Sequence, residues 1–89
     1  MIDKTAIIDS KAKIGKNVTI GPYTVIGPNV EIDENTIIQS HVNISGNTKI
    51  GNNVQIGGGS GVIKDIPDNS KVMGYPSKDL RQFLKNNKW

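Results

Sequence analysis

His41 is the one histidine of this chain, and its side chain is the best suited to general acid–base chemistry near neutral pH. The chain contains no cysteine, which excludes thiolate chemistry and disulfides. Asp33 and Glu34 are near His41 in sequence only, and the sequence places no acid where it would orient the imidazole. His41 is therefore a candidate general base, with a structural or surface histidine as the alternative.

A zinc site is a second chemistry that a histidine could support. Such a site needs several ligands, and one histidine per chain supplies too few. Only a threefold site made by His41 from three subunits could bind Zn²⁺, and each ring would then have to face the threefold axis. We therefore expect no metal site.

The residues around His41 follow a strict six-residue period. Isoleucine or valine recurs at Ile2, Ile8, Ile14, Ile20, Ile26, Ile32, Ile38, Ile44, Ile50, Ile56 and Val62. A small or β-branched residue precedes each member from Ile8 onward by two positions, from Ala6 to Ser60. A spacing of two places both residues on one face of a short extended segment, and the other four residues can turn a corner. Such repeats predict an all-β parallel β-helix.

Three strands per coil give about 18 residues per turn, so positions 18 apart should stack in columns. One column faces solvent with alternating charges: Lys13, Glu31 and Lys49. The other two outward columns are Ile7, Val25 and Asn43, and Thr19, Ile37 and Gln55. Exposed apolar residues in neighbouring columns indicate a subunit contact. We expect a homotrimer that packs through Ile7, Val25 and Ile37, with His41 stacked over Tyr23 at the corner that enters this apolar face.

The repeat is expected to occupy residues 1–63, which is just over three coils. Residues 64–76 read as a turn and a short extended closing segment, because the period stops after Val62. Residues 77–89 are expected to form a helix that covers the open end of the last coil, with Ser77 as its N-cap. Asn17, Asn35 and Asn53 form a corner column, where asparagine tolerates left-handed backbone.

The charge of the chain is concentrated at its C-terminal end. Seven lysines balance seven acidic residues within residues 1–76, and the net charge of +3 comes from the remaining segment. A local basic patch of this kind suits acidic protein partners or phosphorylated ligands better than nucleic acid. No apolar run is long enough to span a bilayer, so a cytoplasmic protein without a transmembrane segment is expected.

Several segments carry a resemblance to a known family. Residues 14–18, 20–23 and 40–42 make residues 2–56 resemble the start of the UDP-N-acetylglucosamine O-acyltransferases of lipid A synthesis. Residues 60–67 and 72–78 are similar to the ending of the N-acyltransferases of that pathway. The chain thus looks like the left-handed β-helix acyltransferases with hexapeptide repeats. The resemblance implies a left-handed β-helix with a short C-terminal helix.

The resemblance also implies a reaction and a site. Family members transfer an acyl group from acyl-CoA or acyl carrier protein to an acceptor such as a nucleotide sugar, in clefts between subunits, with histidine as the base and no bound cofactor. The residues expected at such a site are His41 as base and Tyr23, Asn43, Ser60, Gly61, Lys64 and Arg81 as contacts to substrate or donor.

The chain departs from the family in one respect that bears on activity. Its repeat joins a family-like beginning directly to a family-like ending, as in a truncation, a gene remnant or an engineered miniature. The central coils that carry the family's catalytic histidine pattern are missing. Two functions therefore stay open: a shortened acyltransferase, and a non-catalytic trimeric β-helix scaffold.

Overall fold

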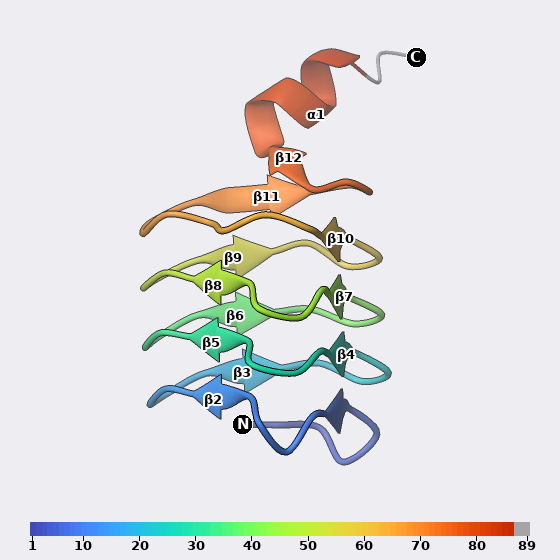
Figure 1. The fold of residues 1–89 in the computed structure, drawn as a ribbon. Helices are drawn as coiled ribbons and strands as arrows, with labels where there is room; N and C mark the ends of the chain where they lie inside the picture. Colours follow the sequence, from blue (N-terminus) through green and yellow to red (C-terminus); the bar gives the residue numbers. More distant parts are fainter. Residues whose placement is uncertain (87–89) are drawn as a thin grey trace.

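The structure is a computed structural model and describes residues 1–86 of the chain. It confirms the predicted fold, a left-handed parallel β-helix with one short C-terminal helix (Figure 1). The strands are β1 (Ile7–Ile8), β2 (Lys13–Ile14), β3 (Thr19–Ile20), β4 (Val25–Ile26), β5 (Glu31–Ile32), β6 (Ile37–Ile38), β7 (Asn43–Ile44), β8 (Lys49–Ile50), β9 (Gln55–Ile56), β10 (Gly61–Val62), β11 (Lys71–Met73) and β12 (Lys78–Asp79), and the helix is α1 (Leu80–Asn86).

Three parallel sheets form the sides of the coil. Their strand orders are β1-β4-β7-β10, β2-β5-β8 and β3-β6-β9-β11, and β12 pairs antiparallel with β11. The register confirms the predicted columns: Ile7 pairs with Val25, and Val25 with Asn43. Each strand up to β9 directs its second residue inward, because successive side chains of a strand point to opposite faces.

The interior of the coil is a stack of these inward residues. Ile20, Ile26, Ile38, Ile50 and Ile56 are each 0–1% exposed, and burying such a side chain stabilises the fold by about 1.5–3 kcal/mol. Two of the buried threonines, Thr24 and Thr36, form side-chain hydrogen bonds with backbone groups. Thr36 Oγ1 donates to the carbonyl of Gly51 at 2.8 Å and accepts from the amide of Val54 at 3.3 Å. The core is therefore apolar without leaving such hydroxyls unpaired.

The sequence pattern predicted that the repeat ends after Val62, but the coil continues beyond this residue. Ile66 forms a parallel bridge with Ile50, and Val72 pairs with Ile56 within β11. Both partners are sixteen residues apart instead of eighteen, so this coil is two residues shorter than the others. The β-helix therefore extends into the segment 64–76 and is longer than the expected three coils and a fraction.

The C-terminal helix begins later than predicted. Lys78 and Asp79 form β12, and α1 starts at Leu80. Asp79, and not Ser77, acts as the cap: its Oδ1 accepts a hydrogen bond from the amide of Arg81 at 3.0 Å. The helix stands beyond β11 and β12 at the end of the coil (Figure 1). Residues 87–89 of the expected helix lie outside the described residues.

The helix of the described part is too short and too polar to cross a lipid bilayer.

Candidate functional site

The corners of the coil have left-handed backbone at a regular spacing. The residues with positive φ are Asn17, Tyr23, Asn29, Asn35, His41, Asn47, Asn53, Gly59, Asn69 and Gly74. Asparagine and glycine adopt this conformation most readily. Tyr23 (φ 58°) and His41 (φ 58°) are the exceptions, and such a conformation costs a bulky residue about 1–3 kcal/mol. Strain at two neighbouring positions points to a role for these side chains outside the fold.

Tyr23 and His41 lie one coil apart at the same corner. Their ring centroids are 5.2 Å apart with an angle of 37° between the planes, which is within the range of favourable aromatic pairs. The amide of His41 donates to the carbonyl of Pro22 at 2.9 Å, so the backbone that carries the imidazole is tied to the coil below. Both side chains are exposed. Tyr23 and His41 thus form an aromatic ledge at this corner.

A short hydrogen-bond chain supports the ledge from the first coil. Thr5 Oγ1 accepts from the amide of Tyr23 at 3.0 Å and donates to Asp3 Oδ1 at 2.6 Å. The amide of Thr5 donates to the same carboxylate oxygen at 2.9 Å. The hydroxyl of Thr5, and secondly its amide, hold the pKa of the Asp3 carboxyl below its ordinary value. The ionised carboxylate thus fixes the threonine that positions Tyr23.

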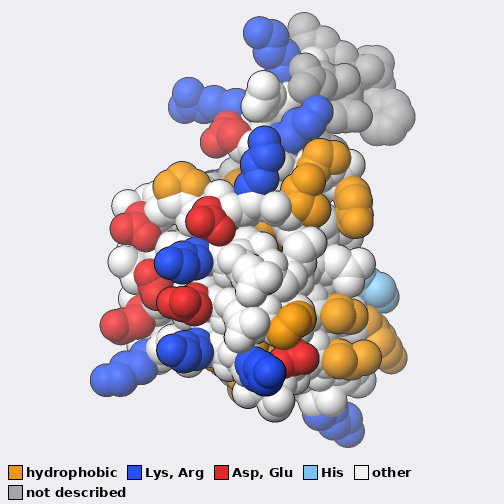
Figure 2. Space-filling model, in the orientation of Figure 1, with side chains coloured by type: hydrophobic (Ala, Val, Ile, Leu, Met, Phe, Trp, Pro, Cys, Tyr) orange, Lys and Arg blue, Asp and Glu red, His pale blue; other side chains and the backbone are white. Residues whose placement is uncertain are grey.

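Apolar side chains flank the ledge on both adjoining faces. Ile7 and Val25 project from β1 and β4, and Ile37 projects from β6, with exposed fractions of 66%, 40% and 42%. Figure 2 shows hydrophobic side chains and the histidine together along the right-hand edge, whereas acidic side chains gather at the left. The exposed apolar surface that the sequence predicted is therefore present beside His41.

The predicted donor-binding residues differ in how accessible they are. Asn43 is exposed on β7, two residues after His41, and Lys64 is exposed after β10. Ser60 is buried, and its Oγ donates to the carbonyl of Gly57 at 2.6 Å and accepts from the amide of Gly74 at 3.3 Å. Gly61 is buried beneath the ring of Tyr75. Ser60 and Gly61 therefore serve the fold in this chain, because their surfaces are already covered.

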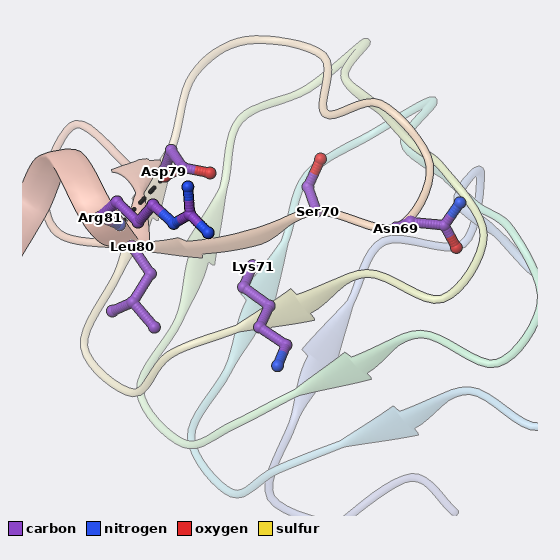
Figure 3. A pocket seen from close by; sticks show the side chains of 6 residues that line it. All are labelled: Asn69, Ser70, Lys71, Asp79, Leu80 and Arg81. Carbon is purple, nitrogen blue, oxygen red and sulfur yellow. Dashed lines mark hydrogen bonds between the residues drawn. The ribbon is translucent and has the colours of Figure 1, made fainter.

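Arg81 lines a separate open pocket of about 500 Å³ between the last coil and α1. The other lining residues are Asn69, Ser70, Lys71, Asp79 and Leu80. Figure 3 shows Asp79 and Arg81 together at one end and Asn69 at the other. Lys71 lines the same pocket as Arg81 and was not predicted as a site residue, although the six-residue step from Ile66 to Val72 could have placed it on an outward face.

The candidate base has no carboxylate partner among the contacts described above: the ring of His41 packs against Tyr23. No group of three potential metal ligands occurs within residues 1–86, and the threefold zinc site would involve a single residue type from three chains. The arrangement offers one imidazole with accessible ring nitrogens beside an apolar surface. This suits proton transfer better than metal chemistry.

Comparison with known proteins finds the same hexapeptide repeat. Residues 11–46 match the family model described as bacterial transferase hexapeptide (six repeats). No curated protein sequence matches the chain. Among solved structures, serine acetyltransferase from Neisseria gonorrhoeae superposes with a TM-score of 0.85 at 29% identity, over 90% of this chain and 34% of that chain. The chain thus spans about a third of the length of this similar enzyme.

Two further structures share the fold. A hexapeptide-repeat acetyltransferase from Vibrio cholerae, complexed with acetyl-CoA, has a TM-score of 0.60 and 19% identity over 85% of this chain and 63% of that chain. PerB from Caulobacter crescentus, with CoA and GDP-perosamine, has a TM-score of 0.55 and 17% identity over 88% of this chain and 55% of that chain. The matched residues 11–46 show the hexapeptide repeat in this chain, and these two structures share its coiled fold.

Proposed function

We propose that the chain carries out, or is the coil portion of a protein that carries out, acyl transfer from a thioester donor to a hydroxyl or amine. The observation that carries the proposal is the position of His41. It is the one histidine of the chain, and it lies at a strained corner beside an exposed apolar surface on a hexapeptide coil. The similarity to serine acetyltransferase at 29% identity supports the reaction class.

The proposed step uses one of the ring nitrogens of His41. The imidazole takes the proton from the acceptor hydroxyl or amine as that group attacks the carbonyl carbon of the thioester. The carbon–sulfur bond then breaks, and the leaving thiolate receives a proton from the imidazolium. The acyl group ends on the acceptor and the donor leaves as a free thiol, so His41 returns to its neutral form.

The donor is proposed to be acyl-CoA or acyl carrier protein. Lys64 is exposed after β10, and its ammonium group suits a phosphate. Lys71 and Arg81 in the pocket near α1 add two further cations for the same purpose. Ser60 and Gly61 contribute only by shaping the coil, since both are covered.

The acceptor remains a choice between two chemical classes. Motif resemblance to the lipid A enzymes favours a nucleotide sugar. The structural neighbour crystallised in complex with serine, at 28% identity, favours a small amino acid with a free hydroxyl. Both present the nucleophile that the proposed step requires, so the experiment below includes both.

A homotrimer is the proposed assembly. Ile7, Val25 and Ile37 would pack against the next subunit and leave His41 at the edge of the resulting cleft. Burial of these three side chains would also remove water from the surroundings of the base, which strengthens electrostatic interactions with the substrate.

The second candidate is a trimeric scaffold without turnover. It is favoured by the surroundings of His41, because the imidazole packs against Tyr23 and the described contacts do not include a carboxylate that orients it. Such an orienting group usually accompanies a catalytic histidine. The scaffold would assemble through the same apolar surface and would differ only in that it catalyses no reaction.

Release of thiol from acetyl-CoA distinguishes the two candidates. Purified protein is incubated with acetyl-CoA and either serine or UDP-N-acetylglucosamine, and free thiol is followed by absorbance. Acyl transfer predicts release that depends on the acceptor and falls about 100-fold or more in His41→Asn, the range of a lost general base. Acceptor-dependent release that is equal in the variant would remove His41 from the mechanism, and no release would favour the scaffold.

A further inference from the structure

Leu84 of α1 is an apolar side chain that points into solvent, with 59% of its surface exposed. Leu80 lies four residues earlier on the same side of the helix and lines a small groove with Val72 and Met73 of β11. Leu84 stands one turn, or about 6 Å, further along the helix axis. Because the helix leads away from the last coil (Figure 1), Leu84 is presented beyond the end of the coil.

Three cations share this end of the molecule with Leu84. Lys78 lies in β12, directly before α1, and Arg81 and Lys85 lie one turn apart within the helix. All three side chains are exposed. Figure 2 shows that Lys and Arg side chains predominate at the upper end of the molecule, whereas acidic side chains gather on the coil. The name cationic end is used below for Lys78, Arg81, Leu84 and Lys85.

The cations are spread along the segment and do not converge on one point. Arg81 and Lys71 line the open pocket beside α1, whereas Lys78 and Lys85 do not line it. Asp79 is the one acidic residue of the segment 77–86, and its Oδ1 accepts a hydrogen bond from the amide of Arg81. A small anion in the pocket would therefore leave Lys78 and Lys85 without a partner. An extended anionic surface would contact both.

The exposed Leu84 distinguishes between extended anionic partners. The phosphates of a nucleic acid are contacted by cations and offer no apolar surface for Leu84. The surface of an anionic membrane offers both interactions, because the headgroups attract Lys and Arg and the acyl chains beneath accept an apolar side chain. The long stems of Lys78 and Lys85 also let their charges stay at the level of the headgroups. The charge and the polarity of the cationic end thus match a lipid surface.

We propose that the cationic end is a docking surface for membranes that contain anionic phospholipids. The helix α1 has seven residues, which is about two turns, so the contact is shallow and reversible. The coil of residues 1–76, whose lysines and acidic residues balance, would stay in the water. The inference does not rest on the proposed acyl transfer, because binding needs no turnover.

Sedimentation with vesicles tests the docking surface without any assay of activity. The protein is mixed with vesicles of phosphatidylcholine alone, or of phosphatidylcholine and phosphatidylglycerol in equal parts, and the bound fraction is measured after centrifugation. The proposal predicts binding to the anionic vesicles and much weaker binding to the neutral ones. Raising the salt from about 0.1 M to about 0.5 M should release the protein, since salt screens the charges. Millimolar sn-glycerol 3-phosphate should not release it.

Charge-reversed variants locate the contact on the molecule. Lys78→Glu/Lys85→Glu should lower the partition coefficient about 25-fold or more, since each cation at an anionic surface contributes about fivefold. The matched control is Lys13→Glu/Lys49→Glu, which makes the same change of net charge on the solvent face of the coil. The control should lose much less binding. Amide spectra establish that both variants are folded.

A second pair of variants tests the apolar contact. Leu84→Ser should lower the partition coefficient about fivefold or more, because it removes the side chain that enters the lipid. Ile63→Ser is the control: Ile63 is 50% exposed beside β10, away from the helix. This control should bind like the wild type.

The proposal is wrong if the wild-type protein does not bind anionic vesicles at low salt, or if both charge-reversed variants lose binding equally. Release by sn-glycerol 3-phosphate would assign the cations to a small phosphate ligand instead. Equal binding by Leu84→Ser and wild type would leave ionic attraction alone, as expected for a soluble acidic partner, and would also overturn it. Vesicle binding without thiol release would support the docking surface and reject the proposed acyl transfer, so the two proposals can fail separately.

Discussion

The amide of Lys49 donates a hydrogen bond to the side-chain Oδ1 of Asp65 at 2.9 Å, at a position where the two preceding coils use a backbone carbonyl. The equivalent amides of Lys13 and Glu31 donate to the carbonyls of Val30 and Thr48. The Asp65 carboxylate therefore replaces a backbone group where the last coil is two residues shorter, and it lets the six-residue register resume at Ile66.

Replacement of Asp65 should weaken the last coil. Asp65→Ala removes the acceptor of the Lys49 amide and should lower the free energy of unfolding by about 1 kcal/mol, whereas Asp65→Asn keeps an oxygen there and should lose less. Urea unfolding measures both. The matched control is Asp33→Ala on an exposed corner, expected within about 0.5 kcal/mol of wild type. Equal losses in both alanine variants would contradict the replacement of a backbone acceptor.

The left-handed corners predict opposite effects for two substitutions. His41→Asn places the favoured residue at φ 58° and should raise the free energy of unfolding by about 1 kcal/mol. Asn35→Ala places a less suitable residue at φ 61° and should lower it by a similar amount. Thermal unfolding of both proteins is the measurement. Destabilisation in His41→Asn would show that the stack with Tyr23 outweighs the backbone strain.

The sequence predicted the coil and its outward columns because a strict six-residue period allows few other arrangements of the chain. The pairing of Ile7 with Val25 and of Val25 with Asn43 follows once positions 18 apart are stacked. The last coil was not predicted because the step from Val62 to Ile66 breaks the six-residue period. The Asp65 carboxylate replaces a backbone carbonyl at this step, and the sequence pattern did not indicate such a replacement. Ser77 was chosen as the cap because the antiparallel pairing of Lys78 and Asp79 with β11 could not be read from local residues.

The candidate site was predictable only in part. The column of 18 placed His41 over Tyr23, and the ring pair agrees with that expectation. Two contacts at the site could not be predicted from the sequence. Tyr75 covers Gly61 because the chain folds back after the coil, and Ser60 is held by hydrogen bonds with Gly57 and Gly74. The left-handed backbone at Tyr23 and His41 could have been inferred, since asparagines recur six residues on either side.

A charged residue on the apolar face should prevent assembly. Val25→Glu places a carboxylate among the exposed side chains of Ile7 and Ile37, where an interface would desolvate it. Light scattering should report a trimer for wild type and monomers or aggregates for the variant. Lys13→Glu, a charge change on the solvent face, is the control and should leave the mass unchanged. A trimer that persists in Val25→Glu would place the interface elsewhere.

The support of Tyr23 by Asp3 should depend on pH in a defined direction. Hydrogen bonds from Thr5 lower the pKa of Asp3, so their contribution is present above the ordinary aspartate pKa of about 3.9 and is lost as pH falls through the lower pKa of the folded protein. Carboxyl carbon resonances measure the titration. Thr5→Val removes the hydroxyl, the larger cause, and should raise the Asp3 midpoint; an unchanged midpoint would contradict the assignment.

Transfer of a labelled acetyl group tests the central claim most directly. The protein is mixed with acetyl-CoA that carries isotope in the acetyl group, and the acceptor is recovered and examined by mass spectrometry. Acyl transfer through His41 predicts labelled acceptor with the wild-type protein and a loss of about 100-fold or more with His41→Asn, which keeps the left-handed corner intact. Unlabelled acceptor with the folded wild-type protein, or equal labelling in the variant, would contradict this account.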